Sequence, residues 1–467
     1  MKYLPRLIDS YLSDWAESSV RKPLLLRGAR QVGKSCAVRN LASKFKTFIE
    51  INFERNPEFN EVFKKNLDVD RILTEISILT KTSITDGETL LFFDEIQMSR
   101  EAIMSLRFFK EDRPGLHVVA AGSLLEFTLA EIPTFGVGRI HSMFMYPMTF
   151  DEFLTANNET LLIEARNKAS YLEPLSESLH NKLVELFRFY LLVGGMPEAV
   201  AKWVETGDYL KCQKVLDDLI VGYEQDFAKY RKKINVELLQ KVFRSSALQL
   251  TKKFTYADVI GNYSTYEIKD AVNLLCMAGL LTPVKRTDAN GIPLGSEVND
   301  RYFKILTLDP GLTLRLLDLN AGEGTELQKE ILNQTAADLV NKGPMAELTA
   351  GLELLRYRDP NLRHELYYWT RQEKNSVAEI DYVLAHSRRI LPLEVKAGTR
   401  GGMKSLWLFM HSKHLTTGVR CSLENMGWFE HSSAAGQEGE ENKTFKILIL
   451  PLYAISQLNR QLSEFLR

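Results

Sequence analysis

The chain has 467 residues, of which 45% are hydrophobic and 25% are charged, a balance typical of soluble globular proteins. This length is enough for roughly two to four domains. The formal net charge of −1 excludes a global field that would attract nucleic acid or membranes, so any basic surface must be local.

The cysteines and the start of the chain narrow the class further. Four cysteines are widely spaced, without the spacing of metal ligands or of a disulfide framework: Cys36, Cys212, Cys276 and Cys421. Residues 1–15 lack the apolar core of a secretory signal, and no run approaches about 18 consecutive apolar residues. We therefore expect a cytoplasmic protein with no membrane partner.

An apolar strand, a glycine-containing loop and the start of a helix are predicted over residues 23–38. The sequence there fits the pattern G-x-x-x-x-G-K-[ST]. Its glycines let backbone N–H groups wrap phosphate oxygens, its lysine reaches the β- and γ-phosphates, and its serine hydroxyl ligates magnesium. The predicted nucleotide-binding residues are Gly28, Ala29, Arg30, Gln31, Val32, Gly33, Lys34 and Ser35. The alternative is a glycine-rich turn that only looks like a phosphate loop.

Two further strands are predicted to complete this site. Residues 89–97 begin with a buried strand, at whose end Asp94 would hold magnesium and Glu95 would polarise the attacking water. The alternative is a pair of solvent-facing acids. Residues 116–125 form another buried strand, after which Ser123 either senses the γ-phosphate or is an ordinary turn serine.

An arginine that acts on the γ-phosphate is expected after these strands. Arg139 is the best candidate, in this chain or in a neighbouring copy, and Arg30 is a weaker one. The alternative for both is a solvated surface arginine. Strands and helices alternate to about residue 155, which predicts a mostly parallel sheet.

The middle of the chain is mostly helical in pattern. Residues 156–234 are interpreted as a structural lid packed on the nucleotide domain. Three helices and a β-hairpin then follow over residues 235–320 and resemble a winged helix. Between Lys229 and Lys253 there are eight Lys or Arg residues and one acid, Glu237. This stretch either contacts DNA phosphates or is a solvated helix face.

The C-terminal third carries a second group of charged residues. A helix with Glu347 precedes two strands that hold Asp381 in the first and Glu394 and Lys396 in the second. Glu394 and Lys396 are two residues apart and share one face of their strand. Carboxylate oxygens are ligands for magnesium, so Asp381, Glu394 and Glu347 are candidate metal ligands, and Lys396 would position a water. The alternative is a polar strand face turned to solvent.

The order of helices and strands, with D-x(12)-E-x-K on adjacent strands, resembles the PD-(D/E)XK nuclease fold. In that fold Asp381, Glu394 and Lys396 would be catalytic, and Lys404 on the following helix would touch a phosphate. Ile380 replaces the proline that the name of the fold records before the aspartate, which makes the match less specific.

The whole chain resembles bacterial and archaeal AAA-type P-loop ATPases with a C-terminal domain of unknown function in the PD-(D/E)XK nuclease clan. The matching stretches follow in order: LRGARQVGKS, LLFFDEIQ, AAGSLLEF, GRI with MYPMTFDEFL, GGMPEAV, and AEIDYVL with LPLEVKAG. The resemblance implies an AAA-type core, a winged-helix linker and a nuclease-like domain, without a settled biological role.

The predicted fold class is therefore α/β and multidomain. The four predicted parts are a P-loop AAA-type parallel-sheet ATPase core (1–155), a helical lid or linker (156–234), a winged-helix-like domain (235–320) and a C-terminal restriction-endonuclease-like α/β domain (325–467). The expected cofactors are ATP and Mg²⁺, and DNA is the expected partner of the basic stretch and the C-terminal domain.

Three functions remain open at this point. The first is an ATP-controlled, magnesium-dependent DNA nuclease in defence or repair. The second is an ATPase switch whose nuclease-like domain is inactive and binds DNA or a protein. The third, a remodelling ATPase acting on proteins, ranks last because no pore motif is recognisable. The sequence leaves open whether the chain forms a homo-oligomer.

Overall fold

The chain divides into two compact units. The computed structural model describes residues 3–123, 125–132, 138–230, 234–317, 343–373, 376–396, 402–433 and 443–467. Unit 1 consists of Met1–Met148, Leu274–Leu280 and Asp359–Arg363. Unit 2 consists of Thr149–Asn273, Leu281–Arg358 and His364–Arg467.

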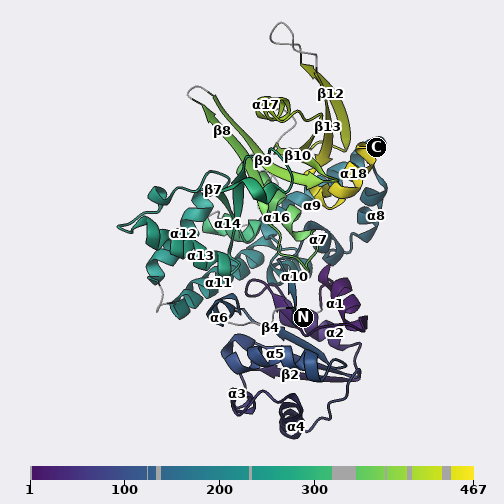
Figure 1. The fold of residues 1–467 in the computed structure, drawn as a ribbon. Helices are drawn as coiled ribbons and strands as arrows, with labels where there is room; N and C mark the ends of the chain where they lie inside the picture. The colour runs from purple at the N-terminus through teal and green to yellow at the C-terminus, as the bar shows by residue number, and fades with distance from the viewer. Residues whose placement is uncertain are drawn as a thin grey trace. The chain divides into compact units, whose positions relative to one another are not determined.

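Unit 1 alternates strands with helices along the chain (Figure 1). Its strands are β1 (Leu24–Arg27), β2 (Thr47–Asn52), β3 (Thr89–Asp94), β4 (His117–Ala121) and β5 (His141–Phe144). Its helices are α1 (Ile8–Glu17), α2 (Lys34–Ala42), α3 (Phe59–Lys64), α4 (Val69–Thr80), η1 (Ile96–Met98), α5 (Arg100–Asp112) and α6 (Leu125–Glu131).

The five strands of unit 1 form one parallel sheet in the order β2-β3-β4-β1-β5. Every residue of β3 and β4 is buried, which explains the continuous apolar runs in these strands. Because the strands are parallel, their carboxyl ends meet at one edge, where ligands bind in open α/β sheets. The parallel sheet and the α/β fold class are confirmed.

Unit 2 begins with a helical region. Its helices are α7 (Phe150–Ala156), α8 (Thr160–Lys168), α9 (Glu177–Val193), α10 (Pro197–Thr206), α11 (Tyr209–Asp226), η2 (Phe227–Tyr230), α12 (Val236–Leu248), η3 (Tyr256–Asp258), α13 (Thr265–Met277), η4 (Leu294–Glu297), α14 (Pro310–Leu316), α16 (Gly343–Arg356), α17 (Lys404–Ser412), η5 (Leu452–Gln457) and α18 (Leu458–Phe465). The last residues of α13 belong to unit 1.

The second sheet is mixed and has eight strands in the order β12-β13-β11-β10-β9-β8-β6-β7. The strands are β6 (Leu281–Thr287), β7 (Val298–Thr307), β8 (Leu366–Glu373), β9 (Ser376–His386), β10 (Arg389–Val395), β11 (Thr417–Ser422), β12 (Gly427–Ser433) and β13 (Lys443–Pro451). β6 pairs in parallel with β8, with Val284 opposite Leu366.

This pairing joins two segments that the sequence placed in different domains. The β6–β7 hairpin belongs to the predicted winged-helix-like segment, yet it shares one sheet with the strands of the predicted nuclease-like domain. The predicted boundary between residues 320 and 325 lies outside the described residues, and the domain bounds stay a prediction. Within the described ranges, no helix is both long and apolar enough to span a membrane.

Candidate functional site

The phosphate loop lies between the end of β1 and the start of α2. Gly28 has a φ of 146°, and a Cβ at this position would lie 2.1 Å from the carbonyl oxygen of Met145. Gly33 has a φ of 98° and is the N-cap of α2. Both positions therefore require glycine, one for a close backbone approach and the other for a left-handed conformation. The loop ends at a helix N-terminus, which favours an anion.

Lys34 holds its ammonium inside this loop. Its Nζ donates hydrogen bonds to the carbonyl oxygens of Gly28, at 2.9 Å, and Ala29, at 2.7 Å. The side chain is buried, and burial lowers the pKa of Lys34 to about 8, although Glu95 and Asp94 act in the opposite direction. Because no carboxylate among the described residues forms an ion pair with it, the ammonium is available to phosphate oxygens once they enter the loop.

Ser35 and Asp94 meet at the carboxyl edge of the sheet. The Ser35 hydroxyl lies 3.1 Å from each carboxylate oxygen of Asp94, and Asn52 Nδ2 donates to Asp94 Oδ2 at 3.2 Å. Burial raises the pKa of Asp94, and the neighbouring Glu95 adds to this effect. A hydroxyl and one carboxylate, completed by phosphates and water, are a donor set that magnesium accepts. The residues present therefore fit Mg²⁺.

Glu95 and Ser123 also lie together, at the ends of β3 and β4. Glu95 Oε2 accepts hydrogen bonds from the Ser123 hydroxyl, at 3.1 Å, and from Gln97 Nε2, at 2.5 Å. Glu95 has a φ of 49°, a left-handed conformation that is uncommon outside glycine and often marks functional sites. A Cβ on Gly122 would lie 2.0 Å from Gln97 Oε1, so Gly122 leaves room for this contact. The predicted water-polarising acid and the predicted sensor are thus direct neighbours.

The two candidate arginines have different surroundings. Arg139 forms an ion pair with Glu111 of α5, and its side chain is 53% exposed. Arg30 acts on Lys34 by lowering its pKa, which places the two cations near each other in the loop. The action of either arginine on a γ-phosphate stays a prediction.

Arg6 is a buried residue beside the phosphate loop and was not predicted. Its Nη1 donates to the carbonyl oxygen of Val32 at 2.8 Å, and its Nη2 donates to that of Tyr146 at 2.7 Å. Arg6 therefore ties the phosphate loop to the segment after β5. No motif surrounds Arg6, and only the fold brings it to a loop about 26 residues away.

In unit 2, four predicted residues lie on neighbouring elements. Asp381 on β9 accepts a hydrogen bond from the backbone N–H of Val395 on β10, at 2.7 Å. Glu394 Oε1 lies 2.5 Å from the ammonium of Lys396. Glu347 lies on α16, which packs against β7 and β10.

The side chains of Glu347, Asp381 and Glu394 are here called the acidic cluster. Lys304 on β7 lies beside this cluster and was not predicted. Its ammonium lies 2.7 Å from Glu347 Oε1 and 2.6 Å from Glu379 Oε1, and its side chain is only 1% exposed. Burial alone would lower the pKa of Lys304, but Glu347, Glu379 and Asp381 raise it overall, so the amine stays charged. A buried cation among several carboxylates gives the cluster an internal counter-charge.

The carboxylates of the acidic cluster hold their protons more tightly than usual. Burial, followed by the charge of Asp381, raises the pKa of Glu394 to about 7. Burial and Asp381 also raise the pKa of Glu347 well above its ordinary value, and burial raises that of Asp381. These three carboxylates and Lys304 therefore act as one electrostatic group.

The acidic cluster, as it is arranged, does not fit a divalent cation. In the part of the chain that the structure describes, no group of three or more His, Cys, Asp or Glu side chains is placed to hold a metal ion. The Lys304 ammonium already pairs with Glu347, one of the candidate ligands, and with the neighbouring Glu379. One feature favours a metal ligand: Glu394 Oε2 is buried and has no hydrogen-bond partner among the described residues. Lys404 is exposed at the start of α17.

The basic stretch from Lys229 to Lys253 is largely paired with acids. Three of its cations form ion pairs: Lys229 with Asp226 at 3.1 Å, Lys241 with Glu237 at 2.7 Å, and Arg244 with Glu224 at 3.6 Å. Residues 231–233, which carry three more of the cations, lie outside the described residues. The described part offers less free positive charge than its composition indicates.

Three family models match separate parts of the chain. The family model of an AAA domain matches residues 20–154. Two domains of unknown function match the rest, DUF8612 over residues 184–323 and DUF4143 over residues 342–428. No curated protein matches the chain.

Two solved structures were compared with the whole chain. A Walker-type ATPase of Pyrococcus abyssi has a TM-score of 0.43 and 15% identity, over 68% of this chain and 96% of that chain. The ADP complex of S. cerevisiae Hsp104 has a TM-score of 0.27 and 12% identity, over 76% of this chain and 43% of that chain. By the family model and the geometry of the phosphate loop, residues 20–154 are similar to a P-loop domain of the AAA type.

Proposed function

We propose that the protein binds ATP with magnesium in unit 1 and hydrolyses it. Lys34 and the backbone N–H groups from Gly28 to Ser35 hold the phosphates, and Ser35 with Asp94 holds the magnesium ion. Magnesium neutralises charge on the phosphates during transfer. Glu95 orients the attacking water, and Ser123 fixes the Glu95 carboxylate by a hydrogen bond.

The contact between Ser35 and Asp94 is the observation that carries this proposal. Residues 59 positions apart meet at 3.1 Å, and they are the two donors that a nucleotide-bound magnesium ion requires. Lys34 is buried in the same loop, and Glu95 follows Asp94 directly. A glycine-rich turn without nucleotide chemistry would have no reason to bury a lysine and an aspartate side by side.

The test is phosphate release from ATP by the full chain, with Glu95→Gln as the variant. Glutamine keeps the size of the side chain but cannot accept a proton from water. We expect ATP affinity to stay within about threefold of wild type while turnover falls roughly 100-fold or more. Equal turnover in the variant would exclude Glu95 as the base, and no turnover in the wild type would contradict hydrolysis.

We further propose that unit 2 responds to ATP binding and hydrolysis in unit 1, and that it binds a partner without cleaving it. The support for this proposal is Lys304, whose ammonium lies among the carboxylates that a cleaving site would need for metal. The competing candidate is the magnesium-dependent DNA nuclease of the sequence prediction. The orphaned Glu394 Oε2 favours that candidate, which would require Lys304 to leave the cluster.

A cleavage assay separates these two candidates. Plasmid and linear DNA are incubated with the full chain and Mg²⁺ or Mn²⁺, with and without ATP, beside Asp381→Asn. We expect no cleavage above background in either protein. Cleavage by the wild type that disappears in Asp381→Asn would establish the nuclease and overturn the binding role.

A further inference from the structure

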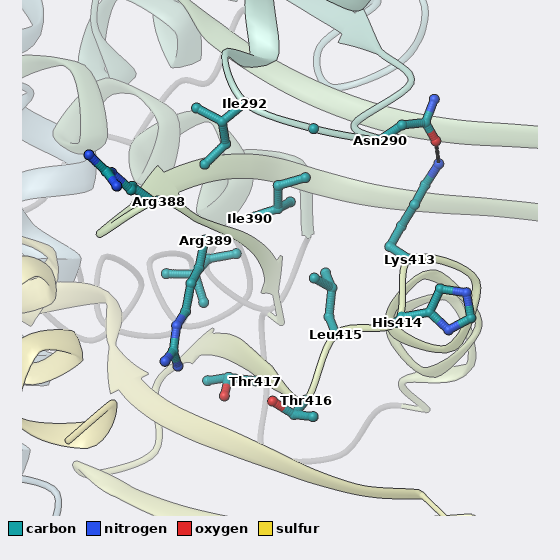
Figure 2. A pocket seen from close by; sticks show the side chains of 12 residues that line it. Asn290, Ile292, Arg388, Arg389, Ile390, Lys413, His414, Leu415, Thr416 and Thr417 are labelled. Carbon is teal, nitrogen blue, oxygen red and sulfur yellow. Dashed lines mark hydrogen bonds between the residues drawn. The ribbon is translucent and has the colours of Figure 1, made fainter.

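Two neighbouring cavities open in unit 2, away from the acidic cluster. The larger has a volume of about 830 Å³ and lies between the β9–β10 turn, the loop after β6 and the segment after α17 (Figure 2). The smaller has a volume of about 440 Å³ and shares Ile292 with the larger. Ile292 lines both cavities, and the two cavities together are here called the basic trough.

The residues that line the basic trough carry positive charge and no negative charge. The cations are Arg358, Arg388, Arg389 and Lys413, and the histidines are His364, His386 and His414. Neither set of lining residues contains an aspartate or a glutamate. In a chain with a net charge of −1, an acid-free surface of this extent is a local positive field.

Two arginines in the basic trough have no acidic partner. Arg388 and Arg389 are exposed, and neither forms an ion pair within the described ranges. Ser387 and Arg388 both have positive φ, 48° and 63°, and form the tight turn between β9 and β10. Such turns favour asparagine and glycine, so an arginine here is held at some conformational cost.

The lining also offers a suitable set of hydrogen-bond donors. Lys413 donates to Asn290 Oδ1 at 2.5 Å, which fixes its ammonium at one side of the larger cavity. Figure 2 shows Arg388 on the opposite side and the hydroxyls of Thr416 and Thr417 near the lower wall. Guanidinium, ammonium and hydroxyl groups are the donors that contact phosphate oxygens in nucleic-acid interfaces.

We propose that the basic trough binds the phosphodiester backbone of a nucleic acid, without reading its sequence. This rests on the proposed binding role of unit 2 and names the partner of that role. The bound groups are successive phosphates, one contacted near Arg388 and Arg389 and another near Lys413.

The placement of the cations favours a chain of phosphates over a single small anion. Figure 2 shows Arg388 and Lys413 at opposite sides of the larger cavity, and Arg358 lines the smaller one, so separate phosphates suit these cations better than one shared phosphate. The only ring among the lining residues of the larger cavity is His414, so base stacking is not the main contribution of that cavity; the rings of the smaller cavity belong to Tyr357, Tyr367, His364 and His386. The contact is therefore expected to be with the backbone of a duplex.

The basic trough is separate from the acidic cluster. Arg389 and Glu394 are five residues apart on β10, which corresponds to roughly 16 Å along an extended strand. Nucleic acid in the trough therefore does not need the carboxylates, and binding should survive Asp381→Asn.

The test measures binding of the full chain to a labelled duplex DNA of mixed sequence over a series of salt concentrations. The variant is Arg388→Asn with Arg389→Gln, since asparagine tolerates the left-handed conformation at position 388. We expect roughly tenfold weaker binding or more at 0.1 M salt. The slope of log K against log salt should fall by about 1.8, at about 0.9 per lost phosphate contact.

The matched control is Lys182→Ala with Lys202→Ala, which removes the same charge from α9 and α10. It should bind like the wild type, and thermal unfolding checks that all variants are folded. Binding is also measured with duplex RNA and with polyglutamate. These two measurements show whether the trough binds a phosphodiester backbone or any polyanion. Comparable binding to both duplexes supports backbone contact, and binding to DNA alone narrows the partner to DNA.

Three outcomes would overturn the proposal: no duplex binding by the wild type, equal binding by the arginine variant, or polyglutamate bound as tightly as duplex. ATP hydrolysis by the wild type is measured in parallel. If the wild type binds duplex through the trough but does not hydrolyse ATP, only the proposed ATPase function is refuted. If the wild type hydrolyses ATP but the arginine variant binds duplex as tightly as the wild type, only the proposed trough is refuted.

Discussion

Replacing Lys34 with alanine is expected to weaken ATP binding by roughly 10²- to 10⁴-fold and to abolish measurable hydrolysis. The Lys34 ammonium is buried in the phosphate loop, where it donates hydrogen bonds to the carbonyl oxygens of Gly28 and Ala29. Charged hydrogen bonds to two phosphates are worth about 1.5–3 kcal/mol each. Alanine removes both contacts, and the loss should be visible by titration calorimetry with ATP and magnesium.

The pH dependence of ATP binding supplies an independent check on Lys34. Burial lowers the pKa of Lys34 to about 8 in the nucleotide-free protein, so the amine is charged at pH 7 and mostly neutral at pH 9. At pH 9 the amine must first take up a proton before ATP binds. This requirement should weaken the affinity for ATP by about tenfold for each pH unit above the pKa of Lys34. Arg30→Ala is the comparison within the same loop: because Arg30 lowers the pKa of Lys34, this variant should keep the pH dependence but with its midpoint at higher pH. A Lys34→Ala chain that kept it would show that another group titrates.

The sequence was sufficient to predict which residues of the proposed nucleotide site lie together, because the pattern is local. The loop from Gly28 to Ser35 is one continuous motif, and a parallel sheet brings the ends of its strands to one edge. The contacts Ser35–Asp94 and Glu95–Ser123 follow from that rule. Arg6 could not be predicted in the same way, because its partners are backbone carbonyls that carry no residue signature.

Unit 2 was harder to predict because many of its contacts join residues that are far apart in the sequence. The spacing of Asp381, Glu394 and Lys396 is a local pattern of two paired strands, and it was visible. The parallel pairing of β6 with β8 joins residues about 80 positions apart, and no hydrophobic period indicates it. That pairing brings the β6–β7 hairpin, and with it Lys304, into the sheet of the acidic cluster. No motif surrounds Lys304 in the sequence, so its place beside the carboxylates was not predicted.

Replacing Lys304 with methionine is expected to destabilise unit 2 by about 3–5 kcal/mol at pH 8, since it leaves buried carboxylates without their counter-charge. The pKa values of Glu347, Asp381 and Glu394 are raised, so deprotonation of these groups already disfavours folding. The sign follows from linkage: stability is lost as pH rises from the unfolded carboxyl pKa of about 4.5 through the folded value, about 7 for Glu394. Without Lys304 the loss should be larger and extend to higher pH. Denaturant unfolding at pH 5 and pH 8 measures it, with near wild-type stability expected at pH 5.

Divalent cations then distinguish an internal counter-charge from an ordinary buried ion pair. If the ammonium keeps metal out of the acidic cluster, Mn²⁺ should restore the stability of Lys304→Met at pH 8, by about 2.7 kcal/mol at 100 times its dissociation constant. The same gain should be absent in wild type and abolished by adding Asp381→Asn to the variant. Lys285→Met is the matched control, because Lys285 lies on the same hairpin as Lys304 and pairs with Glu365 but is 28% exposed. This change should cost no more than about 1 kcal/mol. A metal effect in the wild type that depends on Asp381 would mean that Lys304 does not displace the ion, and the nuclease candidate would then become the better account of unit 2.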